Sequence, residues 1–263
     1  MGIAEQLDAV NKGFTKIAAI ATLKSVSIVI GESAPEGRAA CPGPQNAYRN
    51  GTMYRSYTAA SFFRIWQLAK RHGVNLDGAL TWAFTFEDQA WFAGYRPLAS
   101  NGIDLPVMNV FRLFAKMGAT RLSASSDDAL ALDDVMGHGV RARPDVGVLA
   151  SKTADGKVAV LSWHYHDDDV KGLDATITVK LQGLGKGASA KVTQWRVDQS
   201  HANAFTAWQA MGSPQSPNAM QHQALEAASA MPAVALASLA LKDSAASLSF
   251  ALARQDVTLL IIE

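Results

Sequence analysis

The stretch Val26-Ser27-Ile28-Val29-Ile30-Gly31-Glu32-Ser33 joins a short apolar strand to a carboxylate at its carboxyl end. Later in the chain, Ala79-Leu80-Thr81-Trp82-Ala83-Phe84 repeats the pattern and leads into Thr85-Phe86-Glu87-Asp88. Residues 57–72, between the two stretches, have the apolar spacing of a helix. Barrel enzymes place catalytic residues at the carboxyl ends of such strands. A lone Glu32 would be interpreted as a solvated loop carboxylate, but the repetition favours a functional site.

The composition is that of a globular protein with a sizeable core. Of 263 residues, 49% are hydrophobic and 18% are charged, enough for one large domain or two ordinary ones. With 24 basic and 23 acidic residues and no Lys/Arg run, neither nucleic acid nor an anionic membrane is an expected partner. The single Cys41 excludes an internal disulfide framework and a cysteine-based zinc site.

Targeting and membrane signals do not stand out in the sequence. No apolar run approaches the roughly 20 residues of a membrane span. The first eight residues lack the basic and apolar regions of a signal peptide. The sequence therefore predicts a soluble protein, cytoplasmic or periplasmic, without deciding the compartment.

The segment 1–118 alternates helices and strands. The spacing predicts a helix over 3–21, the first strand, a helix over 57–72 that ends at Gly73, and the second strand over 79–84. Asp104 is a plausible N-cap for a further helix that has Pro106 in its first turn and ends near Met117.

The segment 119–263 has a different texture, with short alternating strands separated by turn residues. Such spacing predicts an antiparallel β-sandwich with one helical insertion over 218–231. A polar stretch over 118–140 separates the two segments, which supports domains at 1–118 and 119–263. Strands are expected over 145–152, 157–165, 175–181, 190–197, 247–253 and 257–263.

Several motifs together resemble glycoside hydrolase family 39, in particular its bacterial β-xylosidases. The resemblance implies the C-terminal part of a (β/α)8 TIM barrel followed by a β-sandwich, and retaining hydrolysis of saccharides that contain β-linked xylose. The motifs are Ile30-Gly31-Glu32-Ser33, Pro44-Gln45-Asn46-Ala47-Tyr48-Arg49-Asn50-Gly51-Thr52, Leu80-Thr81-Trp82-Ala83-Phe84, Phe86-Glu87-Asp88-Gln89, Asn101-Gly102-Ile103-Asp104-Leu105-Pro106, Val110-Phe111-Arg112 and Trp163-His164-Tyr165-His166-Asp167-Asp168-Asp169.

The resemblance also implies roles for four residues. Glu32 would be the catalytic nucleophile at the end of the seventh barrel strand. Trp82, ending the eighth strand, would be the sugar platform, although barrel core is an equally good interpretation. Glu87 and Asp88 would accept hydrogen bonds from sugar hydroxyls, the alternative being a solvated loop. No cofactor and no metal are expected.

The chain is too short for a complete barrel. A barrel takes about 250 residues, and the predicted sandwich over 119–263 already uses more than half of the 263 residues, so only the last two barrel strands are expected here, with open edges that favour self-association. Retaining hydrolysis also needs a second carboxyl about 5 Å from the nucleophile. In the family that acid/base follows an Asn, and this sequence has no Asn-Glu dipeptide. Before Glu32 the carboxylates are Glu5 and Asp8, on the first helix. We therefore expect impaired activity, or alternatively a non-catalytic carbohydrate-binding or interaction module.

Other polar and aromatic groups are further candidates for a site. His164 and His166, with the Asp run that follows them, could ligate a metal. The favoured interpretation is structural: the two histidines lie at the end of a strand, and the Asp run begins a turn. Spacing alone does not decide whether Tyr54, Arg55 and Tyr57 line the loop above Glu32. Trp195 and Trp208 are expected to be packing residues.

Overall fold

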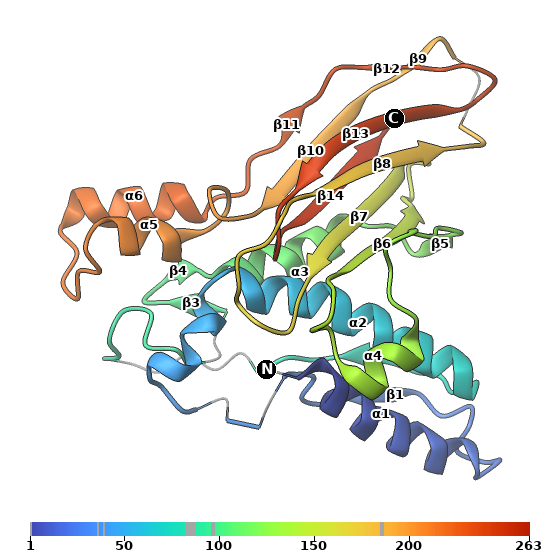
Figure 1. The fold of residues 1–263 in the computed structure, drawn as a ribbon, viewed down its shortest axis with the longest axis horizontal. Helices are drawn as coiled ribbons and strands as arrows, with labels where there is room; N and C mark the ends of the chain where they lie inside the picture. The colour runs from blue at the N-terminus through green and yellow to red at the C-terminus, as the bar shows by residue number, and fades with distance from the viewer. Residues whose placement is uncertain (1, 36, 39, 83–87, 96–97, 185–186) are drawn as a thin grey trace.

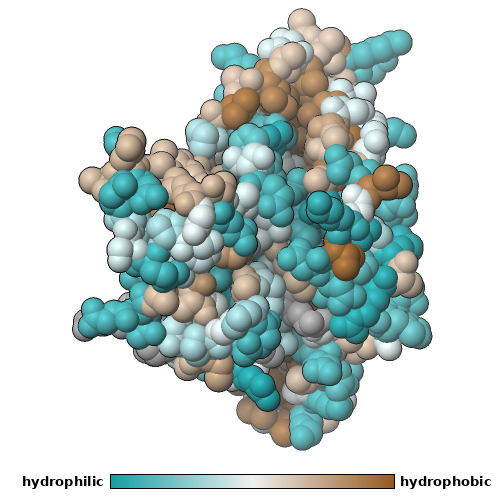
Figure 2. Space-filling view, turned by 60° about the vertical axis from the view of Figure 1, so that its left-hand side comes forward, coloured by the Kyte–Doolittle hydropathy of each residue, from teal (hydrophilic) through white to brown (hydrophobic). Residues whose placement is uncertain are grey.

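The computed structural model describes residues 2–35, 37–38, 40–82, 88–95, 98–184 and 187–263. Long antiparallel strands form the upper part of the molecule in Figure 1, and helices with short strands lie beneath them. On the face shown in Figure 2 hydrophilic and weakly apolar residues are mixed, and strongly hydrophobic residues gather near the upper and lower ends. Across the described residues, no helix has the length and hydropathy that a bilayer span requires.

The N-terminal segment alternates helices with two short parallel strands. The elements are α1 (Ile3–Ala18), β1 (Ile28–Ile30), the 3-10 helix η1 (Pro44–Asn50), α2 (Thr52–His72) and β2 (Leu76–Ala79). Strands β1 and β2 pair in parallel and α2 connects them. Helix α2 ends at Gly73, whose φ of 62° is the left-handed conformation that glycine favours at a helix end. The predicted end of this helix is thereby confirmed.

Strand β2 lies earlier in the sequence than expected. Ile30 pairs with Ala79, and two further hydrogen bonds connect Leu80 N to the Ile30 carbonyl (2.9 Å) and Ser33 N to the Leu80 carbonyl (2.6 Å). The short β1 thus provides partners only as far as Leu80. The prediction that Trp82 ends the strand was wrong, since it follows β2 in an irregular segment, and Phe84 lies outside the described residues.

A tight hairpin precedes the next helix. It consists of β3 (Ala99–Ser100) and β4 (Ile103–Asp104), with Asn101 (φ 47°) and Gly102 (φ 83°) at its turn. Positive φ at both positions is what a type I′ turn requires. Helix α3 (Pro106–Lys116) follows. The expectation of Asp104 as N-cap was wrong, because Asp104 pairs within the hairpin, Leu105 occupies the cap, and the Asp104 carboxylate binds Arg112 at 2.5 Å.

A six-stranded antiparallel sheet dominates the C-terminal segment, with strand order β11-β10-β14-β7-β6-β5. Two smaller pairs, β8 with β13 and β9 with β12, lie outside it, and three helices complete the segment. The elements are β5 (Thr120–Leu122), α4 (Leu132–His138), β6 (Asp145–Lys152), β7 (Val158–Tyr165), β8 (Ala175–Leu181), β9 (Ser189–Ala190), β10 (Val192–Val197), α5 (Ala204–Ala210), α6 (Ala219–Ser229), β11 (Val234–Ala235), β12 (Leu239–Ala240), β13 (Ala246–Leu252) and β14 (Val257–Ile262).

The central strands β7 and β14 are buried on both faces. Leu161, Trp163 and Leu259 join the core that the sheet shares with α2 and α3. On the opposite face, Val160 and Leu260 belong to a second cluster that includes residues of β8 and β13. Two buried faces explain the nearly continuous apolar sequence of these strands. The division predicted between residues 118 and 119 falls between α3 and β5.

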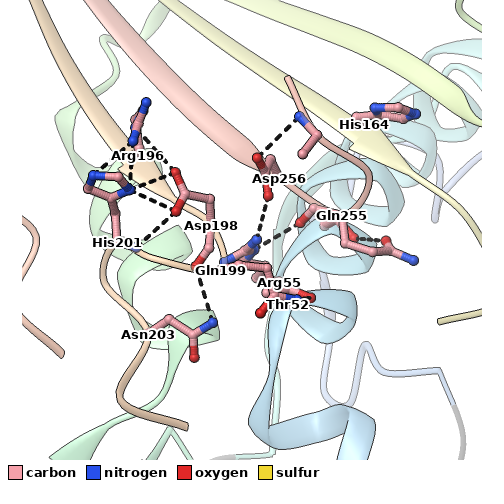
Figure 3. Close-up of polar contacts among 12 residues, drawn as sticks. Thr52, Arg55, His164, Arg196, Asp198, Gln199, His201, Asn203, Gln255 and Asp256 are labelled. Atoms are coloured by element: carbon pink, nitrogen blue, oxygen red, sulfur yellow. Dashed lines mark hydrogen bonds and ion pairs between the residues drawn. The ribbon is translucent and has the colours of Figure 1, made fainter. Parts of the chain in front are cut away.

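Helix α2 is joined to the sheet by a polar junction, shown in Figure 3. The fully buried Arg55 donates to the Gln255 carbonyl and to the Asp256 carboxylate, each at 2.9 Å. Ser56 donates to the Gln255 side-chain carbonyl at 2.5 Å. Arg55 therefore holds the turn between β13 and β14.

Candidate functional site

Glu32 lies just beyond the carboxyl end of β1 and is exposed. It lines a groove of about 520 Å³ between α1 and β1, together with Ile28 and Ile30 of the strand. Helix α1 contributes the other wall through Glu5, Gln6, Ala9, Val10, Gly13, Phe14 and Ile17. A carboxylate in this position matches the place of catalytic groups in barrel enzymes.

A second carboxylate, Glu5 in the first turn of α1, lines the same groove. Both Glu5 and Glu32 are exposed. The groove therefore holds two carboxylates from segments that are far apart in sequence. The sequence placed Glu5 on the first helix, but its pattern gave no indication that this helix lies beside Glu32.

Ser33, the residue after Glu32, is held by hydrogen bonds from two different segments. Besides the Leu80 contact, the buried Ser33 accepts a 2.8 Å hydrogen bond at its hydroxyl from the side-chain amide of Gln6. The Gln6 carbonyl in turn accepts a hydrogen bond from the hydroxyl of Tyr57 on α2. Gln6 thus connects α2 to the segment that carries Glu32. Sequence reasoning missed this role, because one glutamine on an amphipathic helix is indistinguishable from a solvated residue.

Trp82 is half-buried, and Thr81, the residue before it, is bound by a side chain of α2. The hydroxyls of Tyr54 and Thr81 lie 2.8 Å apart and share a hydrogen bond. Tyr54 thus reaches the residue before Trp82, and Tyr57 reaches Gln6, which binds the residue after Glu32. Neither tyrosine is among the residues that line the groove of Glu32, and Arg55 binds the turn between β13 and β14 instead.

Asp88, the described member of the remaining predicted binding pair, does not line the groove of Glu32. Asp88 is exposed, with a φ of 52°, and Glu87 lies outside the described residues. Among the described residues, neither Trp82 nor Asp88 lines the groove of Glu32. Their joint placement around one sugar remains a prediction.

The histidines and aspartates after Trp163 make structural contacts. His164 Nδ1 lies 2.8 Å from the Leu252 carbonyl, and burial lowers its pKa. His166 Nε2 lies 3.0 Å from the Arg141 carbonyl. The buried Asp167 accepts from the Tyr165 hydroxyl (2.7 Å) and from the Val140 backbone amide (2.9 Å). Within the described ranges, no cluster of three or more His, Cys, Asp or Glu residues could hold a metal ion.

The two tryptophans expected to pack do so in different places. Trp208 of α5 is buried against Phe92, at a ring-centroid distance of 4.9 Å. Trp195 of β10 is partly buried, and the Lys116 ammonium lies 4.8 Å from the centre of its ring. Both expectations are confirmed.

Solved structures similar to this chain are glycoside hydrolases about twice its length. A bacterial orthologue of human α-L-iduronidase has 16% identity and a TM-score of 0.76, over 97% of this chain and 45% of its own. A monomeric β-xylosidase from Caulobacter crescentus CB15 has 18% identity and a TM-score of 0.66, over 97% and 48%. A GH39 enzyme from Xanthomonas axonopodis pv. citri has 14% identity and a TM-score of 0.69, over 98% and 48%.

Sequence comparisons identify the family. A search of curated proteins returned no significant match. The family model described as "Glycosyl hydrolases family 39" matches residues 19–241, a region that includes β1, β2 and most of the antiparallel sheet. This match covers more than half of the sequence and confirms the family resemblance found in the motifs. The chain therefore belongs to glycosyl hydrolases family 39.

Proposed function

We propose that this chain carries the nucleophile half of a retaining β-xylosidase-type active site, with Glu32 as the nucleophile. The observation that supports this proposal most strongly is that Glu32 follows the carboxyl end of a parallel strand and lines a groove. In the proposed reaction a Glu32 carboxylate oxygen attacks the anomeric carbon, and the leaving group departs with its bonding electrons. Water then attacks the same carbon and releases Glu32.

Substrate contacts are proposed for Trp82, Glu87 and Asp88. The face of an aromatic ring suits the apolar C–H face of a pyranose, and carboxylates suit its hydroxyls. The hydrogen bond between Tyr54 and Thr81 supports this role for Trp82, because it fixes the residue immediately before the ring.

We propose that hydrolysis by this chain alone is slow for unactivated glycosides. The sequence has no Asn-Glu dipeptide to provide the family's acid/base. General acid assistance is worth about 10²- to 10⁴-fold. The expected result is turnover of xylobiose far below that of a full-length family member. Turnover equal to that of a full-length member would contradict the proposal.

The architecture proposed for the chain is the end of a (β/α)8 barrel over 1–118 and a β-sandwich over 119–263. Support comes from the parallel β1–β2 pair with its connecting helix, followed by the antiparallel sheet. The described residues form no closed barrel. The chain spans about half the length of its solved relatives.

The nucleophile is tested with a 2-fluoro xyloside that carries a dinitrophenyl leaving group. Because dinitrophenolate departs without protonation, labelling does not need the acid/base. Peptide mass mapping should locate a slowly formed adduct on Glu32. Glu32→Gln should abolish the label, whereas Glu5→Gln, which neutralises the other carboxylate of the groove, should keep it. An adduct on Glu5 would refute the assignment of Glu32.

The alternative function is a non-catalytic carbohydrate-binding or interaction module. The observation that favours it is that the sequence contains no Asn-Glu dipeptide, the motif that carries the acid/base in the family. The labelling experiment separates the two functions. Absence of any label, together with saturable binding of xylose or xylobiose, would support the module.

A further inference from the structure

A second cavity, of about 270 Å³, lies in the loop between β2 and β3. It shares no lining residue with the groove of Glu32. Its walls come from η1, from the loop that follows Asp88 and from the β3–β4 hairpin. The lining residues are Asn50, Gln89, Ala90, Phe92, Ala93, Gly94, Tyr95, Ala99, Ser100, Asn101 and Gly102. We call this cavity the loop pocket.

The loop pocket is held in shape by η1. Buried Arg49 donates to the Gly94 carbonyl at 3.0 Å, and buried Asn50 donates to the Phe92 carbonyl at 2.8 Å. Gly94 has a φ of 87°, and a Cβ there would lie 3.0 Å from the Gly43 carbonyl oxygen. The backbone of the loop therefore approaches η1 as closely as only glycine allows.

Helices α5 and α6, inserted between β10 and β11, hold the other side. Gln215, in the connection between them, accepts from the Trp91 backbone amide at 2.8 Å and donates to the Trp91 carbonyl at 3.4 Å. The Phe92 ring packs against those of Phe205 (5.5 Å) and Trp208 (4.9 Å). An irregular segment fixed by side chains from both halves of the chain is pre-organised, which reduces the entropic cost of binding a ligand.

The chemistry of the lining selects a neutral polar ligand. Carboxamides are provided by Asn50, Gln89 and Asn101, and hydroxyls by Tyr95 and Ser100. The lining residues that the structure describes are uncharged, and carboxamides and hydroxyls are groups that hydrogen-bond the hydroxyls of a neutral sugar. Drug-sized ligands occupy pockets of roughly 300–1,000 Å³, so a volume of about 270 Å³ suits a single ring.

We propose that the loop pocket binds one neutral pyranose ring, with the side chains of Gln89 and Asn101 hydrogen-bonding its hydroxyls. The Tyr95 hydroxyl donates to the Gln89 side-chain carbonyl at 2.8 Å and so orients that amide. Asn101, at the exposed hairpin turn, donates to the Gln89 backbone carbonyl at 3.4 Å, so the two residues adjoin at the pocket. This site is additional to the proposed reaction at Glu32 and does not depend on it.

The test is titration of the isotopically labelled chain with D-xylose and with D-glucuronate, followed by amide chemical shifts. Xylose should shift the amides of 89–95 and 98–102 saturably, and glucuronate should not. Asn101→Gly removes the carboxamide while keeping a residue that tolerates the positive φ. Because one hydrogen bond is worth about 1 kcal/mol, this variant should bind xylose about fivefold more weakly.

Two controls separate this site from the rest of the molecule. Gln223→Ala removes an exposed carboxamide on α6, outside the pocket, and should leave the affinity unchanged. Glu32→Gln should also leave it unchanged, whatever the labelling experiment shows. No saturable shift in the loop, equal affinity for glucuronate, or binding lost in Glu32→Gln but retained in Asn101→Gly would each overturn the proposal.

Discussion

Tyr54 and Tyr57 stack on α2, with a centroid distance of 6.3 Å and an interplanar angle of 22°. Their hydroxyls bind different segments, since Tyr54 reaches Thr81 beside Trp82 and Tyr57 reaches Gln6, which holds Ser33 beside Glu32. One helical turn of α2 therefore fixes the distance between the proposed nucleophile segment and the proposed sugar platform.

Tyr57→Phe should slow labelling of Glu32 without unfolding the chain. The variant keeps the stacked ring but removes the hydrogen bond to Gln6, so Ser33 and the adjoining Glu32 lose one restraint. At about 0.5–1.5 kcal/mol for a hydrogen bond, the labelling rate should fall about two- to tenfold. Tyr165→Phe is the matched control, because it breaks the hydrogen bond from the end of β7 to Asp167. Equal slowing in both variants would contradict the positioning role.

Arg64→Met should strongly lower the free energy of unfolding. Arg64 of α2 binds the Asp145 carboxylate at 2.7 Å, and both side chains are buried. The variant leaves Asp145 buried without its cation, a change that costs about 3–5 kcal/mol. Arg71→Met, on the same helix, breaks an exposed pair with Asp133 and should cost less than about 1 kcal/mol. Urea unfolding of the two variants measures the difference, and equal midpoints would refute this ranking.

Stability should fall as pH rises from about 4 to about 7 through the titration of Asp256. Burial raises the pKa of Asp256 from 3.8 to about 7, although Arg55, whose own pKa burial lowers to about 10, opposes the rise. In this window the folded chain binds more protons than the unfolded chain, so raising the pH favours unfolding. The stabilising contribution is complete below about pH 4 and lost above about pH 7. Nearby Asp198 also raises this pKa.

Asp256→Asn tests this assignment. The variant should lack the part of the pH dependence that lies between about pH 4 and pH 7, as measured by urea unfolding at several pH values. Asp133→Asn, which changes an exposed carboxylate, should keep the wild-type slope. An unchanged slope in Asp256→Asn would show that another group is responsible.

The sheet was predictable from sequence because its strands carry a local signal. Strands β6 and β8 have the predicted bounds, 145–152 and 175–181, since alternating or continuous apolar runs end at turn residues. The short helices α4 and α5 were not predicted. Each has seven residues, too few for a repeating apolar stripe, and tertiary contacts such as those of Trp208 stabilise them.

The candidate site was predictable only where it is local. Glu32 was identified because strand and carboxylate are adjacent in sequence. Glu5 and Gln6 were not, because their place beside Glu32 depends on how α1 packs on α2. The loop pocket was missed for the same reason, since Asn50, Gln89 and Asn101 come from three segments that only the folded chain brings together.

The chain should self-associate through β1. Within the described residues, β1 pairs with β2 alone, and Val29 of β1 and Leu80 beyond β2 are each more than half exposed. An uncovered parallel pair offers its backbone groups and apolar side chains to a second copy of the chain. Sedimentation velocity should therefore show a concentration-dependent dimer or larger species.

Val29→Lys should weaken this self-association, because a charged lysine opposes edge pairing. Leu173→Lys, at a highly exposed leucine between β7 and β8, is the matched control and should leave the association unchanged. A monomer at all concentrations, or equal weakening by both lysines, would show that β1 is not the contact.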